Sequence, residues 1–189
     1  PWQAGHIVNG DTINGTKYGD IFNVFVDSMK TADPTIKIGA VLFPHDGVYN
    51  DWSKQVLQKV ENKADFLIVH DYFRRTPNPN NVTYQEMLAS VNEVQQDKNN
   101  VNNMVLSYTN KPSGYYPIAM TEFNSKTGER EISMANAIFI AQALAEQIKN
   151  GFASSIIWGF QKGFNSFSGD HGMTARNSSE LSDNSPRPV

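Results

Sequence analysis

The sequence contains no cysteine among its 189 residues. This absence excludes disulfide bonds, a thiol nucleophile and any cysteine-ligated zinc or iron–sulfur site. Long hydrophobic runs are also missing: no stretch approaches about 18 uncharged apolar residues, so no transmembrane helix is predicted. Neither sign of charge dominates, because 16 basic and 19 acidic residues leave a formal net charge of −3. With no basic run either, the sequence does not predict a nucleic-acid-binding surface.

The chain has enough apolar residues for a packed core, since 39% of its residues are hydrophobic. At roughly 150 residues per domain, its length corresponds to about one domain. Both ends read as loops: the chain opens at Pro1-Trp2 without a methionine or signal peptide, and closes on a Ser-, Asn- and Pro-rich stretch over 182–189. We therefore expect a piece of a longer chain, in which residues 1–189 form a single partial domain.

Apolar residues with helical spacing alternate along the chain with short apolar runs typical of buried strands. The helical spacing predicts helices over 18–29, 52–60, 84–94, 101–108 and 134–148. The last of these carries its apolar residues at Met134, Ile138, Ala141, Ala145 and Ile148. The runs predict strands over 36–43, 66–70, 117–121 and 154–160, covered on both faces as in parallel sheets. Residues 104–108 taken alone also suit a strand.

The order of these elements predicts the fold class. The strands begin near residues 36, 66, 117 and 154, so successive starts are 30, 51 and 37 residues apart. A (β/α)8 barrel of about 250 residues repeats roughly every 31 residues, and strand–helix alternation implies parallel strands. We expect an α/β fold: a partial (β/α)8 TIM barrel covering roughly strands five to eight. A doubly wound open sheet is the alternative, but no glycine-rich phosphate-binding loop follows any predicted strand.

In such barrels the reactive side chains sit at the C-terminal ends of the strands. Glu122 directly ends a buried apolar run, where desolvation of a carboxylate costs free energy unless partners surround it. The alternative is an ordinary glutamate that binds an arginine or caps the next helix. His70 and Tyr72 flank Asp71, so both point the same way if the strand continues; the alternative is a core histidine with an aromatic neighbour.

Aromatic side chains near the strand ends are a further candidate feature. Trp158, in the last predicted strand, is either ordinary packing or a stacking surface for the apolar face of a sugar. Loop aromatics would either extend such a surface or fix their loops in place: Trp2, Tyr49, Tyr115 and Tyr116.

A metal site is a weaker alternative, built from His45, Asp46, His70 and Asp71. No metal-ligand spacing supports it, and we expect neither a metal nor a cofactor.

Several of these residues match the motifs of one enzyme group. Residues 18–41 resemble the helix and fifth strand of arabinofuranosidase-like glycoside hydrolases, members of the large (β/α)8 group called clan A. His70-Asp71-Tyr72 resembles that group's H-x-Y at strand six, and Thr121-Glu122-Phe123-Asn124 resembles its T-E-[FWY]-N at strand seven. Trp158 matches the aromatic at strand eight. The segments 171–173 and 186–188 are similar to the loop before the final helix.

The resemblance implies a retaining glycosidase that acts on carbohydrate by double displacement, with two carboxylates about 5 to 5.5 Å apart. It identifies Glu122 as the nucleophile and His70, Tyr72, Asn124 and Trp158 as substrate-binding residues. Hydrogen bonds from Tyr72 and His70 would favour the ionised carboxylate. The family's acid/base glutamate follows an asparagine at the end of strand four, which would lie before Pro1. We therefore expect the fragment alone to be inactive and prone to associate.

Within this class the first expectation is an α-L-arabinofuranosidase. The alternatives are an endo-acting clan A hydrolase on agar, xylan or glucan, because loop variation sets specificity on this fold, and a non-catalytic carbohydrate-binding barrel. An unrelated α/β enzyme acting on small molecules is a third option, which a divalent metal bound at His45 or His70 would favour. No nucleic-acid or membrane partner is expected, and export of the full-length protein would suit an enzyme that degrades polymers.

Overall fold

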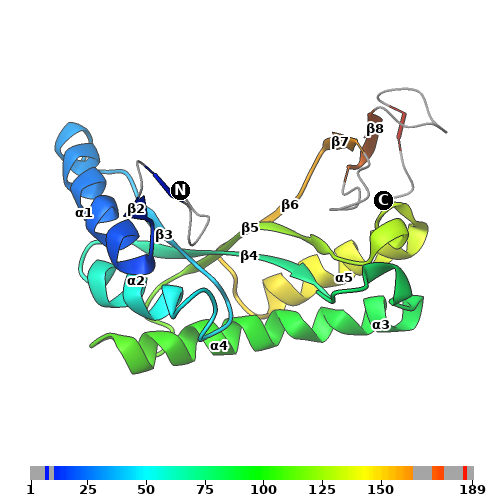
Figure 1. Cartoon of the computed structure of the whole chain (residues 1–189), viewed down its shortest axis with the longest axis horizontal. Helices are drawn as coiled ribbons and strands as arrows, with labels where there is room; N and C mark the ends of the chain where they lie inside the picture. Colours follow the sequence, from blue (N-terminus) through cyan, green and yellow to red (C-terminus); the bar gives the residue numbers. More distant parts are fainter. Residues whose placement is uncertain (1–6, 9–10, 164–171, 177–184, 187–189) are drawn as a thin grey trace. The chain divides into compact units, whose positions relative to one another are not determined.

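The computed structural model describes residues 7–8, 11–163, 172–176 and 185–186 (Figure 1). Its helices are α1 (Gly15–Ala32), α2 (Trp52–Val60), α3 (Tyr84–Ala89), α4 (Glu93–Tyr108) and α5 (Met134–Lys149), with short 3₁₀ turns at Pro79–Asn81, Ser90–Asn92 and Gly128–Ile132. The strands are β1 (Ile7–Val8), β2 (Asp11–Thr12), β3 (Gly39–Leu42), β4 (Phe66–Phe73), β5 (Ile118–Ser125), β6 (Ser154–Ile157), β7 (Gln161–Gly163) and β8 (Thr174–Arg176). Trp2, His171, Arg187 and Pro188, singled out above, lie outside the described residues.

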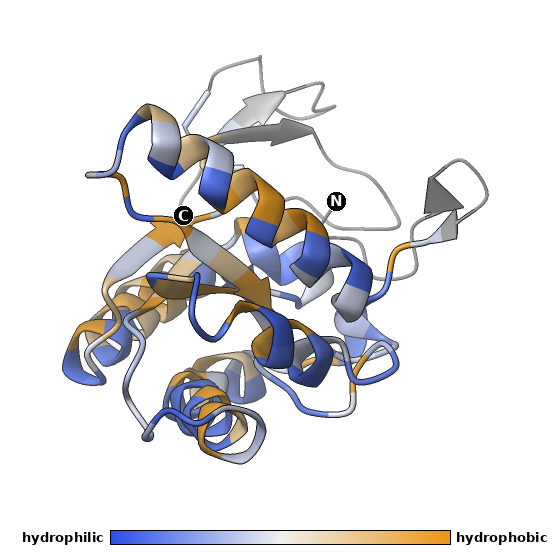
Figure 2. Ribbon diagram, turned by 90° about the vertical axis from the view of Figure 1, so that its left-hand side faces the viewer, coloured by the Kyte–Doolittle hydropathy of each residue, from blue (hydrophilic) through white to orange (hydrophobic). Residues whose placement is uncertain are grey.

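Four strands form a parallel sheet in the order β3-β4-β5-β6, as the α/β prediction requires. In the first pair, Gly39 lies opposite Phe66 and Leu42 opposite Val69. In Figure 2 the strands near the centre are hydrophobic over much of their length, whereas the helices mix hydrophobic and hydrophilic residues. Among the described residues, none of the helices combines the length and apolar character needed to cross a membrane.

The strand bounds differ from the prediction in ways that matter for the site. β4 continues to Phe73 and β5 to Ser125, because the polar residues at their ends stay within the strands. β6 ends at Ile157, so Trp158 follows the strand rather than lying in it. The prediction that both faces of these strands are covered is wrong for β4, where buried residues alternate with half-buried ones from Phe66 to Phe73. It is also wrong for β6, where exposed residues alternate with half-buried ones from Ser154 to Ile157.

The described residues group into two compact units, and β4, α4 and β5 each continue from one unit into the other. The first unit holds the residues up to His70 together with Asp97–Ala119. The second holds Asp71–Gln96 together with the residues from Met120 onward.

In the first unit, α1 packs closely on α2 because glycines face the second helix (Figure 1). A Cβ added at Gly15 would lie 2.4 Å from the backbone oxygen of Trp52, and one added at Gly19 would lie 2.4 Å from the Cβ of Lys59. Two further residues of α1, Phe22 and Val26, are also buried. These contacts fix the distance between the two helices.

We expect Gly19→Ala to destabilise the protein by about 1–3 kcal/mol. The added methyl group would overlap the start of the Lys59 side chain, which is not a flexible chain end. Without that overlap, alanine would gain up to about 1 kcal/mol from its higher helix propensity. Urea unfolding measures the difference, with Ser28→Ala on the exposed surface of α1 as the control. An unfolding midpoint at or above that of the wild type would show that the two helices do not approach this closely.

In the second unit, Thr83 and Glu86 form a capping box at the start of α3. The Thr83 hydroxyl accepts from the Glu86 backbone N–H, and the Glu86 carboxylate accepts from the Thr83 backbone N–H at 2.8 Å. Arg74 adds an ion pair with Glu86 at 2.7 Å. The hydrogen bonds from Thr83 and the Arg74 guanidinium lower the pKa of Glu86 to about 2. This cluster fixes the loop between β4 and α3.

Helix α5 has the predicted position, with Ser133 at its N-cap, but the predicted buried face is wrong. Met134, Ile138 and Ile148 are exposed. The buried positions instead are Asn136, Phe139, Ile140, Ala143 and Gln147. A polar side chain can occupy a buried position when its hydrogen bonds are made inside the protein, as those of Asn136 are.

The predicted break between helices at 94 and 101 is also wrong, as is the strand alternative for 104–108. A 3₁₀ turn at Ser90–Asn92 separates α3 from α4, which then runs unbroken to Tyr108 (Figure 1). The buried residues Val94, Asp97 and Val101 follow one helical stripe. Because the middle position of that stripe is an aspartate, the apolar periodicity is interrupted while the helix is not.

Candidate active site

A phenol and a carboxylate meet between the C-terminal parts of β4 and β5. Along β4, Tyr72 is half-buried while its neighbours Asp71 and Phe73 are buried on the other face. Glu122 on β5 is half-buried beside the buried Phe123. The Tyr72 hydroxyl donates a hydrogen bond to Oε2 of Glu122 at 2.9 Å. The structure therefore brings together these two residues, which are fifty positions apart in the sequence.

The environment of the pair fixes the direction of this hydrogen bond. Burial raises the pKa of the Tyr72 hydroxyl well above its ordinary value, and the hydrogen bond to Glu122 and the negative charge of Glu122 raise it further. The positive charge of Arg75 acts in the opposite sense but is the smaller effect. The phenol thus keeps its proton through the physiological range and donates a hydrogen bond to the carboxylate oxygen.

The remaining residues of the H-x-Y motif divide between the two faces of β4. His70 is half-buried at an alternating position with Tyr72, so both side chains leave the strand on the same side. Asp71 is 5% exposed and belongs to the buried face. Its Oδ1 accepts from the Tyr72 backbone N–H at 2.8 Å, and the Arg75 guanidinium lies 3.9 Å away.

Asn124 lies on β5 two residues beyond Glu122, but its carboxamide contacts the protein interior. The side chain is 1% exposed, and its Nδ2 donates to the backbone oxygen of Trp158 at 2.6 Å. The backbone N–H of Trp158 in turn donates to the backbone oxygen of Phe123 at 3.0 Å. Trp158 itself is 43% exposed, and its peptide bond to Gly159 is cis. Asn124 thus contacts the backbone of Trp158.

Behind this end of β5 lies a buried polar cluster that the sequence analysis missed: Ser125, Thr127, Glu131 and Asn136. The Ser125 hydroxyl lies 2.9 Å from that of Thr127 and donates to Asn136 Oδ1 at 2.7 Å. The Glu131 carboxylate accepts from the backbone N–H groups of Thr127 at 2.9 Å and Gly128 at 3.1 Å. The helical spacing from Asn136 to Phe139, Ala143 and Gln147 was the available signal, but it begins and ends on polar residues.

The loop aromatics in the described part of the chain differ in exposure. Tyr116 is 3% exposed and its hydroxyl donates to the backbone oxygen of Glu61, so it fixes its loop rather than forming a stacking surface. Tyr115 is exposed and packs edge-on against Tyr116 at 4.8 Å between ring centroids. Tyr49 is exposed and lies against Phe43.

Two residues of the metal alternative follow β3 in the first unit. His45 and Asp46 are exposed and line a hollow of about 200 Å³ with four residues of α4. The Asp46 carboxylate accepts from the Tyr108 hydroxyl at 2.6 Å, and this hydrogen bond raises the pKa of Tyr108. Asp46 is thus already engaged with a neighbouring side chain.

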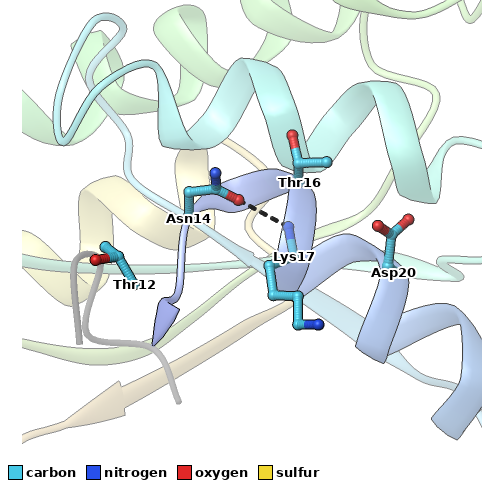
Figure 3. Close-up of a pocket in the computed structure, with 5 residues that line it drawn as sticks. All are labelled: Thr12, Asn14, Thr16, Lys17 and Asp20. Carbon is cyan, nitrogen blue, oxygen red and sulfur yellow. Dashed lines mark hydrogen bonds between the residues drawn. The ribbon is translucent and has the colours of Figure 1, made fainter. Parts of the chain in front are cut away.

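A larger hollow, of about 380 Å³, lies at the N-terminus of α1 (Figure 3). Its lining residues are Thr12, Asn14, Thr16, Lys17 and Asp20. The Asn14 side chain accepts from the Lys17 backbone N–H at 2.8 Å and caps the helix. None of the sequence-predicted site residues lines this hollow.

No protein-family model and no curated protein sequence matches the chain. Several solved structures, however, are similar to the chain. A family 51 α-L-arabinofuranosidase from Bifidobacterium longum is 14% identical at a TM-score of 0.67, covering 94% of this chain and 38% of that one. A family 51 α-L-arabinofuranosidase from Thermotoga petrophila is 19% identical at a TM-score of 0.66, and the match covers 90% of this chain and 33% of that one. A family 44 endoglucanase from Clostridium thermocellum is 17% identical at a TM-score of 0.58, and the match covers 80% of this chain and 39% of that one.

These likenesses concern the fold. The chain spans between 33% and 39% of the length of these three structures. It has the α/β fold of part of a (β/α)8 barrel, as the sequence predicted, and that fold is the one of clan A glycoside hydrolases.

Proposed function

We propose that this chain is the part of a retaining glycoside hydrolase that carries the nucleophile, Glu122. The observation that carries the proposal is the hydrogen bond of 2.9 Å from Tyr72 to Glu122, made between parallel strands near their C-terminal ends. That edge of a (β/α)8 barrel is where reactive groups gather. The fold shared with glycoside hydrolases supports the same reaction class.

In this mechanism the Glu122 carboxylate attacks the anomeric carbon and forms a covalent glycosyl-enzyme, which water then hydrolyses. The attacking oxygen must be ionised and correctly aimed. Tyr72 contributes to both requirements, because its protonated hydroxyl stabilises the charged form and holds Oε2 in place. His70, on the same side of β4, and the exposed indole of Trp158 are the proposed sugar contacts.

We expect Tyr72→Phe to lower kcat/KM about 10- to 100-fold, because the ring keeps its packing while the carboxylate loses a hydrogen bond worth about 1.5–3 kcal/mol. Initial rates on an aryl glycoside measure the loss. Tyr84→Phe, which removes an exposed phenol of the same unit, is the matched control and should change the rate little. If Tyr72→Phe kept the full wild-type rate, Tyr72 would not support the nucleophile.

The acid/base carboxylate belongs, in this proposal, to residues outside these 189. The chain contains one Asn-Glu pair, Asn92-Glu93, and Glu93 begins α4 instead of ending a strand. Its Oε2 accepts from the backbone N–H of Arg74 at 3.1 Å. Glu93 therefore has a structural contact and the wrong position for proton donation to a leaving group. An Asn-Glu at the end of a buried upstream strand would favour the enzyme over a non-catalytic carbohydrate-binding barrel.

For the substrate, we propose an α-L-arabinofuranoside first, because α-L-arabinofuranosidases are among the structures that share the fold. Endo-action on agar, xylan or glucan is the second candidate, since an endoglucanase and a protein bound to neoagarooctaose share the fold as well. A panel of glycosides and polysaccharides decides between them.

The nucleophile is tested by labelling the full-length protein with a mechanism-based fluorosugar and sequencing the modified peptide by mass spectrometry. We expect the label on Glu122, because the fluorosugar traps the glycosyl-enzyme at the attacking carboxylate. A label on any other carboxylate would overturn the assignment.

A further inference from the structure

Trp158 is held in place from β5 through its backbone. Its N–H donates to the Phe123 oxygen at 3.0 Å, and its C=O accepts from Asn124 Nδ2 at 2.6 Å. Trp158 lies just beyond the end of β6, where its own strand no longer fixes it. The position of the indole relative to Glu122 therefore depends on the two residues that follow Glu122 in β5.

The Asn124 carboxamide is in turn oriented by Asn136 on α5. Asn136 Nδ2 donates to Asn124 Oδ1 at 3.0 Å and to the Glu131 backbone oxygen at 2.8 Å, while its Oδ1 accepts from the Ser125 hydroxyl at 2.7 Å. Asn136 is 0% exposed, so these bonds are made without competition from bulk water.

We propose that Asn136 is a positioning residue for the reaction, which sets the place of Trp158 through Asn124. The inference rests on the function proposed above. An amide side chain has one accepting and one donating end, and a flip exchanges them. Because Asn136 and the Ser125 backbone N–H both donate to Asn124 Oδ1, the donating end of Asn124 faces the Trp158 oxygen. Loss of the Asn136 donor removes one of the two bonds that enforce this orientation.

Displacement of Trp158 should affect KM rather than kcat. A tryptophan that stacks on a sugar contributes to binding in the ground state and the transition state alike, so its displacement raises KM and leaves kcat nearly unchanged. A residue that supported Glu122 itself would instead lower kcat.

The test compares two isosteric amide-to-carboxylate changes on α5 in the full-length protein. Asn136→Asp replaces a donor with an acceptor opposite Asn124 Oδ1, and we expect it to raise KM about tenfold with kcat within about twofold of the wild type. Gln147→Glu places the same group at another fully buried position of the same helix, outside the Trp158 contacts, and should leave KM unchanged. Equal KM values for the two variants would overturn the proposal.

A double-mutant cycle shows whether Asn136 acts through the indole. In a Trp158→Ala background, Asn136→Asp should have no further effect on KM, because the group that it positions is gone. A tenfold effect that persists in that background would mean that Asn136 acts elsewhere, and would also overturn the proposal.

A fluorescence measurement separates this proposal from the proposed function. The emission of Trp158 is obtained as the difference between proteins with and without Trp158→Phe, and Asn136→Asp should increase its quenching by acrylamide. That result requires no sugar turnover. If the quenching changed while the wild type neither bound nor cleaved glycosides, the positioning would stand and the proposed function would fail. Unchanged quenching with an active wild type would defeat the positioning alone.

Discussion

Replacing Glu122 with glutamine should abolish glycoside turnover by the full-length protein, lowering kcat by at least about 10⁴-fold, the scale on which removal of a nucleophile acts. A carboxamide oxygen is too weak a nucleophile to form the glycosyl-enzyme, whereas its shape is nearly that of the carboxylate. The amide oxygen of the variant still accepts from Tyr72, so the protein should remain folded. Stopped assays with an aryl glycoside and thermal unfolding together measure the two effects.

The matched control is Glu129→Gln, a change of the same chemistry at an exposed position of the same unit. It should leave kcat within about twofold of the wild type, as expected for surface substitutions. A Glu122→Gln protein that keeps more than a few per cent of the wild-type kcat would contradict the nucleophile assignment. A loss of activity accompanied by unfolding would instead make Glu122 a structural residue.

The parallel strands could be predicted from the sequence because apolar runs mark buried strands, whereas the pairing of Tyr72 with Glu122 followed from the resemblance of their motifs to those of clan A glycoside hydrolases. Once two neighbouring strands are identified, the residues at their ends must meet at one edge of the sheet. The exact strand ends could not be read in this way. Polar residues such as Asn124 and Ser125 continue β5 because partners in the fold satisfy their hydrogen bonds, and those partners come from distant positions such as Asn136.

The same reason explains the errors on α4 and α5. Hydrophobic periodicity assumes that buried positions are apolar, yet Asp97 on α4 and Asn136 and Gln147 on α5 are fully or almost fully buried. On α5 the exposed Met134, Ile138 and Ile148 then formed the more regular apolar series and indicated the wrong face. A polar residue at a buried position is visible only once the tertiary hydrogen bonds are known, and the support for Trp158 is made of such residues.

The 189 residues expressed alone should show no measurable turnover of glycosides, even though they carry Glu122. In the proposed mechanism the leaving oxygen needs a proton from a general acid that lies outside them. General acid–base catalysis raises the reaction rate about 10²–10⁴-fold, and its effect is largest for unactivated sugar leaving groups. Oligosaccharide hydrolysis by the isolated chain and by the full-length protein, at equal concentration, measures the difference. We also expect the isolated chain to associate, because sheet edges that other strands would pair remain open.

The choice of leaving group tests whether the isolated chain lacks only the acid/base residue. A substrate with a strongly activated aryl leaving group departs without protonation, so the isolated chain, if folded, should form the glycosyl-enzyme on Glu122 once and then stall for lack of a base. Added azide, which attacks without base assistance, should release the sugar and restore turnover, and Glu122→Gln should remove both effects. Sustained hydrolysis of an unactivated oligosaccharide by these 189 residues, abolished by Glu122→Gln, would show that the acid/base lies within them.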